Sequence, residues 1–219
     1  MGRAVRLTPS LRSKVWGKTS LGPWFADSPE PVGEVWFTHT EELPLLVKFL
    51  YTSARLSVQV HPADGEDGPR GKTEMWHILD AEPGATIALG FRRPVTREEL
   101  RAAAASGAVE ELLNWMPVKA GETYFAPAHT VHAIGGGIVL CEIQQHSDIT
   151  YRLYDYGRSR QIHVEQSLRV ADLGVHPGAS RPHPETGLLV ACPYFATSVV
   201  EVAGMVAMEN GSLSYRKWQ

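Results

Sequence analysis

Four polar side chains in three separate stretches of the sequence are of the types that bind divalent metal ions. The stretch LSVQVHPAD alternates Ser57, Gln59 and His61 with apolar residues, and this period of two predicts a β-strand with one polar face. Glu74 in GKTEMWHIL and His132 in GETYFAPAHTVHAI would complete, from neighbouring strands, a set of two imidazole nitrogens and two oxygens. Such a set suits Zn²⁺, with iron, manganese or cobalt as alternatives.

The polar face of this predicted strand has two alternative surroundings. In a barrel interior, an unpaired imidazole or carboxylate would cost several kcal/mol, whereas a bound cation would pair with both. At the surface, His61 and His132 would instead be loop-edge histidines that bond to backbone groups. The spacing alone leaves both interpretations open, because scattered residues of these types recur by chance in many chains.

The elements that must position these side chains are short β-strands. Runs rich in β-forming residues, each bounded by Pro, Gly or Asp, are expected at 34–39, 45–52, 56–61, 74–81, 86–91, 123–128, 137–145 and 149–156. Residues 1–34 are expected to form an irregular arm, and the GGG sequence at 135–137 a hairpin turn. Many short strands favour a sandwich or barrel over a parallel βαβ sheet. The predicted fold class is therefore mainly β.

One short helical insertion interrupts the predicted strands at about residues 96–116. Thr96 is expected to be the N-cap ahead of apolar residues at helical spacing. Ser106 and Gly107 break this pattern, so the insertion should contain two short helices. The stretch VEQSLRVADL predicts a further short helix.

Composition and charge exclude several classes of protein. The chain has 219 residues, of which 43% are hydrophobic and 21% charged, and its interspersed charges sum to −3. We therefore expect a globular protein with no nucleic-acid or membrane partner. The sequence has no apolar run of the ~20 residues that span a bilayer and no apolar signal core, which predicts a cytoplasmic location. Cys141 and Cys192 are expected to be free thiols rather than a disulfide or metal ligands.

Several stretches together resemble type I mannose-6-phosphate isomerase in its short bacterial form. They are collinear over about residues 5–205 and read VGEVWF, LPLLVKFL, LSVQVHPAD, GKTEMWHIL, FAPAHTVHAIGGGIVLCEIQQHSDITYRLYDYGR and HVEQSLRVADL. The resemblance implies a zinc-dependent cupin, a jelly-roll β-barrel, that interconverts mannose 6-phosphate and fructose 6-phosphate through an enediol. The metal ligands of the family fall on Gln59, His61, Glu74 and His132, the same four residues that the spacing proposes.

The resemblance also implies catalytic roles for residues near these ligands. Arg152 matches the functional arginine of the family, and its guanidinium would stabilise an enediolate. Lys72 matches the lysine of the K-x-E stretch, where it would clamp phosphate or take part in proton transfer. Asp148 and Glu142 are candidate carboxylates for proton transfer or for orienting Arg152 and Lys72, and orientation is preferred for Asp148.

Binding of a sugar phosphate through its phosphate group is expected from separate donors rather than from a glycine-rich loop. Ser57 shares the polar face of Gln59 and His61. Arg158 follows Arg152 at the position where longer family members carry a basic residue implicated in phosphate binding. Lys72 is the third candidate for this role.

Three features depart from the family pattern. His129 stands where the family usually has Gly, and so lacks the freedom of glycine at positive φ; His146 replaces a smaller residue. Short family members also continue through a second cupin-like half, whereas this chain ends at Gln219. We expect a metal-site domain at 1–180 and a truncated remnant of the second half at 181–219. The remnant would pack as extra strands on the barrel or pair with another subunit in a homodimer.

The predicted function is thus a metal-dependent aldose–ketose isomerase. The alternatives are a non-catalytic cupin that binds a sugar phosphate and a metal-dependent isomerase of another phosphorylated sugar. The combination of Lys72, Asp148 and Arg152 favours an enzyme, because a binding protein has little need for groups that move protons and stabilise negative charge.

Overall fold

The computed structural model of the chain describes residues 6–181, 183, 186–200 and 213–216, and its described part is built mainly of β-strands, as predicted. A seven-stranded sheet has the order β1 (Thr8–Lys18), β2 (Val32–Thr38), β3 (Leu45–Thr52), β10 (Ile138–Gln145), β5 (Glu74–Ala81), β8 (Thr123–Ala126) and β12 (Ala179–Ser180). A five-stranded sheet has the order β11 (Tyr151–Tyr154), β4 (Val58–Val60), β9 (His132–Ile134), β6 (Thr86–Phe91) and β7 (Leu113–Pro117). Neighbouring strands in both sheets are antiparallel.

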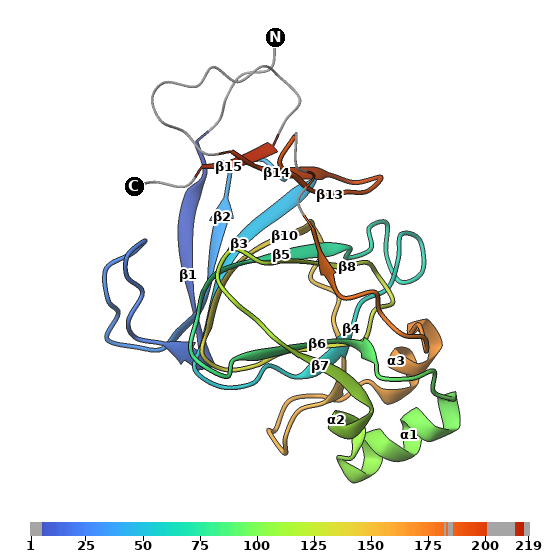
Figure 1. Cartoon of the computed structure of the whole chain (residues 1–219). Coiled ribbons are helices and arrows are strands. Elements are labelled where there is room, and N and C mark those ends of the chain that lie inside the picture. The colour runs from blue at the N-terminus through green and yellow to red at the C-terminus, as the bar shows by residue number, and fades with distance from the viewer. Residues whose placement is uncertain (1–5, 182, 184–185, 201–212, 217–219) are drawn as a thin grey trace.

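The two sheets face each other (Figure 1), and side chains from both form an apolar core. Trp76 and Ile78 on β5 and Leu140 on β10 contribute from the larger sheet, and Ile87 and Leu89 on β6 contribute from the smaller one. Side chains of opposite sheets meet because alternate residues of each strand point to the same face. This arrangement fits the predicted jelly-roll barrel.

The outer face of the five-stranded sheet is covered by three helices, α1 (Arg97–Ser106), α2 (Val109–Leu112) and α3 (Val164–Val170) (Figure 1). Val58 and Val60 of β4 are fully buried in the core that these helices complete. The polar residues that alternate with them must therefore face the barrel interior. In most barrels the apolar residues of a strand face the interior and the polar residues face water. Here the order is reversed, because the helices shield the outer face of the sheet from water.

The helical insertion begins and divides as predicted. The Thr96 side chain accepts a hydrogen bond from the Glu99 backbone N–H, and Gly107 ends α1 in the left-handed conformation at φ 83°. The predicted end of the insertion near residue 116 is wrong, because residues 113–117 form β7 and pair with β6. Cross-strand hydrogen bonding outweighs the helical spacing of the apolar side chains there.

Two further local predictions are wrong. Residues 8–18 within the predicted irregular arm form β1, an edge strand paired with β2. Its side chains are largely exposed, including Val15 at 80%, so no apolar alternation marks it. The segment 135–137 is not a hairpin turn, because it joins β9 of the smaller sheet to β10 of the larger one. A Cβ atom on Gly135 would lie 2.4 Å from the Thr86 carbonyl oxygen, so this crossing requires glycine.

A third, three-stranded sheet contains β13 (Leu188–Ala191), β14 (Ala196–Val200) and β15 (Leu213–Arg216). Leu189 and Val190 from β13 and Phe195 pack with Met75 of β5, against the outer face of the seven-stranded sheet. Part of the predicted remnant of a second half, residues 182, 184–185, 201–212 and 217–219, lies outside the described residues. The division at 180/181 stays a prediction. Within the described residues, none of the helices is long and apolar enough to span a bilayer.

Candidate metal centre and active-site cavity

The five-stranded sheet brings three of the predicted site residues into one row. Gln59 on β4 pairs with Arg152 on β11 at one side and with His132 on β9 at the other. Residues that are directly opposite in adjacent strands project to the same face. Arg152, Gln59 and His132, far apart in sequence, therefore line the barrel interior side by side.

Glu74 and His61 complete a buried cluster with His132. The side chains of His61, Glu74 and His132 are each no more than 2% exposed, and one ligand atom from each lies within 4.8 Å of the others. Glu74 Oε2 is 3.6 Å from His61 Nε2, and Glu74 Oε1 is 3.4 Å from His132 Nε2. Gln59 Nε2 is 3.2 Å from His132 Nε2. The interpretation of these histidines as surface residues is wrong, because both are buried inside the barrel.

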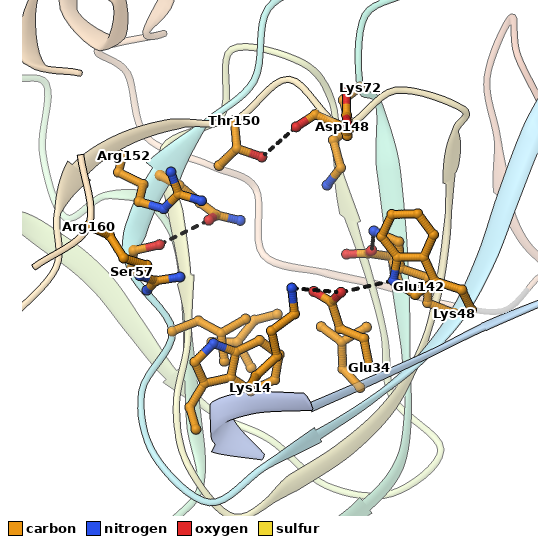
Figure 2. A pocket seen from close by; sticks show the side chains of 16 residues that line it. Lys14, Glu34, Lys48, Ser57, Lys72, Glu142, Asp148, Thr150, Arg152 and Arg160 are labelled. Atoms are coloured by element: carbon orange, nitrogen blue, oxygen red, sulfur yellow. Dashed lines mark hydrogen bonds and ion pairs between the residues drawn. The ribbon is translucent and has the colours of Figure 1, made fainter. Parts of the chain in front are cut away.

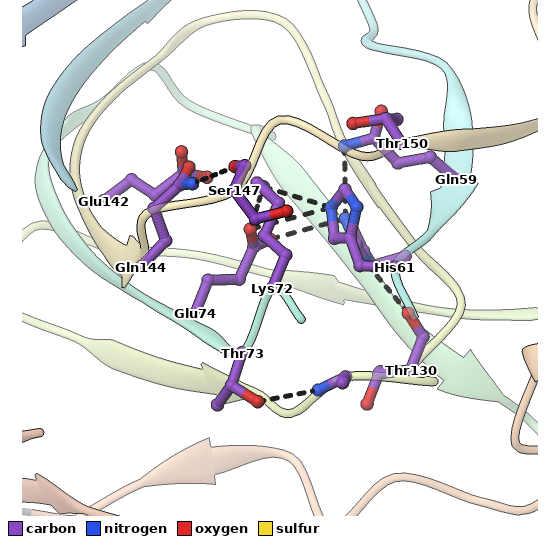
Figure 3. A network of polar contacts seen from close by, with 12 residues as sticks. Gln59, His61, Lys72, Thr73, Glu74, Thr130, Glu142, Gln144, Ser147 and Thr150 are labelled. Carbon is purple, nitrogen blue, oxygen red and sulfur yellow. Dashed lines mark hydrogen bonds and ion pairs between the residues drawn. The ribbon is translucent and has the colours of Figure 1, made fainter. Parts of the chain in front are cut away.

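Backbone hydrogen bonds orient both imidazoles toward Glu74. His61 Nδ1 donates to the Ile149 carbonyl oxygen and His132 Nδ1 to that of Thr130, each at 2.8 Å. These bonds place the ring proton on Nδ1, so each Nε2 is unprotonated and its lone pair points into the cluster. Figure 3 shows the His61 ring directed toward Glu74 and Lys72. The cluster thus has the tautomers that a metal ion needs.

Two observations indicate that these residues fit a divalent cation. Glu74 Oε1 is buried and has no hydrogen-bond partner, which is costly unless a positive charge satisfies it. The Lys72 ammonium contacts Glu74 Oε2 and lies 3.1 Å from His61 Nε2, as a cation bound to these two ligands would. Rotating the Gln59 side-chain amide by half a turn would place its oxygen, in place of its nitrogen, next to His132. That oxygen would complete the N₂O₂ set.

The electrostatics of the cluster follow from burial. Burial raises the pKa of Glu74 to about 7, against the opposing effect of Lys72. Burial lowers the pKa of His132 to about 4 and that of His61 well below its usual range, where Lys72 adds to the effect. Burial disfavours the charged form of Lys72, but Glu142 and Glu74 outweigh it and raise its pKa. Near neutral pH the imidazoles are therefore neutral and Lys72 is protonated.

A cavity of about 280 Å³ adjoins this cluster, and Gln59 and Lys72 belong to its wall. Its wall combines acidic, basic, polar and aromatic side chains (Figure 2): Lys14, Trp16, Glu34, Trp36, Lys48, Leu50, Leu56, Ser57, Gln59, Lys72, Ile134, Glu142, Asp148, Thr150, Arg152 and Arg160. A polar recess of this size beside a metal-type cluster suits a small, charged and hydroxyl-rich ligand.

Glu142 lies in a row of buried polar residues across the larger sheet, opposite Lys48 of β3 and Trp76 of β5. Its carboxylate is 3.1 Å from Lys48 Nζ and accepts a hydrogen bond of 3.2 Å from Trp76 Nε1. Burial would raise the pKa of Glu142, but Lys48 and Lys72 outweigh burial and lower it to about 2. Glu142 is therefore ionised at neutral pH.

The remaining predicted residues are placed as follows. Ser57 lines the cavity and donates to Gln59 Oε1 at 3.1 Å. Asp148 lines the cavity as an exposed residue, and among the described residues its carboxylate accepts no hydrogen bond from Arg152 or Lys72. Arg158 is not part of the cavity wall; it contacts Asp155 and the Arg55 carbonyl oxygen.

The sequence prediction missed three basic residues of the cavity wall: Lys14, Lys48 and Arg160. Lys48 carries a usable signal, because it is the lone charge in the apolar strand LLVKFLYT and lone charges in such strands are rarely buried without a partner. Lys14 lies on β1, which was not predicted as a strand. Arg160 lies in a loop, where sequence spacing gives no direction for a side chain.

The two histidines that depart from the family pattern have defined positions. His129 adopts φ 75°, so it occupies the left-handed region where glycine is favoured. Its ring contacts Glu66 Oε2 at 2.8 Å, and its backbone N–H donates to the His61 carbonyl oxygen at 2.8 Å. His146 Nδ1 donates to the Leu43 carbonyl oxygen at 2.7 Å. His129 thus borders the cluster through a loop that also fixes the His61 backbone.

Known proteins resemble this chain in both sequence and structure, although no family model matches it. The mannose-6-phosphate isomerase of Streptococcus mutans serotype c is 39% identical over 215 residues, which cover 91% of this chain and 67% of that protein. The mannose-6-phosphate isomerase ManA of Bacillus subtilis strain 168 is 33% identical over 254 residues, which cover 92% of this chain and 80% of that protein. The crystal structure of the mannose 6-phosphate isomerase from Bacillus subtilis superposes with a TM-score of 0.77 at 30% identity, covering 87% of this chain and 77% of that one.

Proposed function

This chain belongs to the mannose-6-phosphate isomerase family, and on that premise we propose that it interconverts mannose 6-phosphate and fructose 6-phosphate with a bound divalent metal ion. The observation that supports this most is the convergence of His61, Glu74 and His132 beside a polar cavity. The relatives and the structural neighbour carry the isomerase name, and the cavity has the charge and size for a sugar phosphate. The proposed metal ligands are these three residues and Gln59.

Zinc is the metal we propose, because two imidazoles and a carboxylate form its preferred type of catalytic ligand set. Bound there, the ion would supply positive charge that polarises or orients the sugar oxygens during isomerisation. Gln59 is a neutral ligand, so it leaves most of that charge available. Glu74 would be held ionised by the ion, since its raised pKa reflects a burial that a cation offsets.

The isomerisation moves one proton between C1 and C2 of the sugar through an enediol. We assign this transfer to Glu142, because it is the buried one of the two candidate carboxylates and lines the cavity. Lys72 holds its proton at neutral pH and can donate a hydrogen bond to a sugar oxygen that gains charge. Arg152 lies in the same row as Gln59, where its guanidinium would stabilise the enediolate.

The experiment is a coupled assay of mannose 6-phosphate conversion by the purified chain, before and after treatment with a chelator. We expect turnover that chelation abolishes and added Zn²⁺ restores. Absence of turnover in protein shown by elemental analysis to contain one metal ion per chain would refute the isomerase assignment. A ligand-induced rise in melting temperature without any product would then support a sugar-phosphate-binding protein.

Glu142→Gln and Arg152→Lys test the assigned roles. Both keep the approximate size of the side chain, so we expect each to retain the bound metal and to lower kcat by at least about 100-fold. Unchanged kcat in either variant would contradict the role of that residue. The role of Arg158 in phosphate binding, the cytoplasmic location and the homodimer stay predictions from the sequence.

A further inference from the structure

The side of the cavity opposite Lys48 and Glu142 gathers Ser57, Arg152 and Arg160 (Figure 2). The Arg152 side chain forms no ion pair with a carboxylate among the described residues, and its buried Nε has no hydrogen-bond partner. Burial lowers the pKa of Arg152, and the neighbouring charge of Arg160 lowers it further. Two guanidinium groups that repel each other in a cavity wall are stabilised when an anion binds between them.

Asp155 fixes Arg160 in a single orientation. The Asp155 side chain is only 1% exposed, and its two oxygens accept hydrogen bonds of 2.7 Å from Arg160 Nε and 2.6 Å from Arg160 Nη2. This bidentate contact occupies one edge of the guanidinium. The rest of the group belongs to the cavity wall, where its remaining N–H groups are available to a ligand.

Arg158 has different contacts. Its Nη1 is 3.2 Å from Asp155 Oδ1, and its Nη2 donates to the Arg55 carbonyl oxygen at 2.7 Å. Its guanidinium carbon also lies 5.4 Å from the centroid of the Tyr156 ring. Both terminal nitrogens of Arg158 are therefore engaged, and Arg158 is not part of the cavity wall. Its role there is to contact Asp155.

The charges on this side match those of a phosphate monoester. Arg152, Arg158 and Arg160 carry three positive charges, and Asp155 supplies one negative charge to the group, which leaves a net charge of about +2. A phosphate monoester carries about −1.5 to −2 near neutral pH. On the opposite side, Lys48 is already paired with Glu142, so its charge is largely neutralised.

We propose that Arg160, positioned by the buried Asp155 carboxylate, binds the phosphate group of the substrate, and that Arg158 supports Asp155 without touching the substrate. The proposal rests on the proposed function for the identity of the substrate. It places phosphate at Arg160 and, because Arg152 lies next to Gln59 in the same row, directs the sugar toward the metal ligands.

The test compares Arg160→Ala, Arg160→Lys, Asp155→Asn and Arg158→Ala by their kcat and KM for mannose 6-phosphate. We expect Arg160→Ala to raise KM roughly ten- to hundredfold with kcat changed less than about threefold, because it removes charge-assisted hydrogen bonds to a part of the substrate that does not react. Arg160→Lys should recover only part of the loss, since an ammonium lacks the bidentate fork. Asp155→Asn should raise KM in the same way if Asp155 is a positioning residue.

A direct binding measurement keeps the test independent of turnover. Calorimetric titration with inorganic phosphate should show affinity weakened at least about tenfold in Arg160→Ala relative to the unaltered protein. Arg101→Ala is the matched control, because Arg101 is exposed and pairs with Glu165 on the helical side; its phosphate affinity and KM should not change. Melting temperature and metal content establish that each variant is folded.

Two outcomes would overturn the proposal. One is equal phosphate affinity in the unaltered protein and in folded Arg160→Ala. The other is a larger rise in KM for Arg158→Ala than for Arg160→Ala, which would assign phosphate to Arg158. If the unaltered protein does not turn over mannose 6-phosphate, the proposed function fails, while the phosphate titration still decides the assignment of Arg160.

Discussion

Replacing Lys48 by Met should destabilise the protein by leaving a buried carboxylate without its main partner. Lys48 Nζ lies 3.1 Å from Glu142 Oε2 and donates to Gln144 Oε1 at 2.6 Å, with both charged side chains no more than 7% exposed. Met keeps the length of the lysine stem but not the ammonium. Removing one partner of a buried ion pair typically costs about 3–5 kcal/mol.

The shifted pKa of Glu142 gives a similar magnitude. A folded-state pKa of about 2 against an ordinary value of 4.5 corresponds to about 3 kcal/mol of stability at neutral pH. Burial opposes this depression, and Lys48 is the larger of the two lysine contributions to it. Because the folded pKa is depressed, this stability is present above the unfolded pKa of 4.5 and is lost as the pH falls through about 2. The difference between Lys48→Met and the unaltered protein should therefore be about 3 kcal/mol at pH 7 and narrow below pH 4.5.

Urea unfolding of the zinc-saturated proteins measures this difference. Lys18→Met is the matched control, because Lys18 pairs with Glu82 at 2.7 Å at the surface, and we expect it to lose less than about 1 kcal/mol. The double variant Lys48→Met with Glu142→Gln removes both charges, so it should be more stable than Lys48→Met alone. A loss below about 1 kcal/mol in Lys48→Met, or a double variant less stable than the single one, would refute the reasoning.

Four further outcomes are expected. His132→Ala removes a proposed metal ligand, so elemental analysis should find well under one zinc per chain and the coupled assay at least about a 100-fold loss of activity; full zinc content would exclude His132 as a ligand. Thr96→Ala removes the side-chain acceptor for the Glu99 N–H at 3.1 Å and should cost about 1 kcal/mol in urea unfolding with unchanged turnover. Gly135→Ala would place a Cβ 2.4 Å from the Thr86 carbonyl oxygen and should lower stability by about 1–3 kcal/mol or more; an unchanged melting temperature would contradict this crossing of the chain. Burial raises the pKa of Cys141 to about 12, so in the folded protein at pH 7 a thiol reagent should leave it unmodified and label it only after unfolding.

The sequence by itself determined many of the strands, although not β1 and β7, and the identities of the metal-type cluster. Period-two alternation marked LSVQVH, and β-forming composition between turn residues marked EMWHILDA, because both are properties of neighbouring residues in the chain. Thr96 and Gly107 marked the limits of α1 because capping depends on neighbours in the chain. The residues His61, Glu74 and His132 were identified because their ligand chemistry is a property of the side chains themselves.

The tertiary structure alone decided which way these side chains face and what surrounds them. The polar face of β4 points inward because α1, α2 and α3 cover its apolar face, and no pattern within the strand contains that information. Arg152 lies beside Gln59 through strand pairing across 93 residues of sequence, and Arg160 enters the cavity wall through a contact with Asp155 in an irregular loop. Such contacts depend on packing between distant segments, whereas local sequence records only the preferences of each segment.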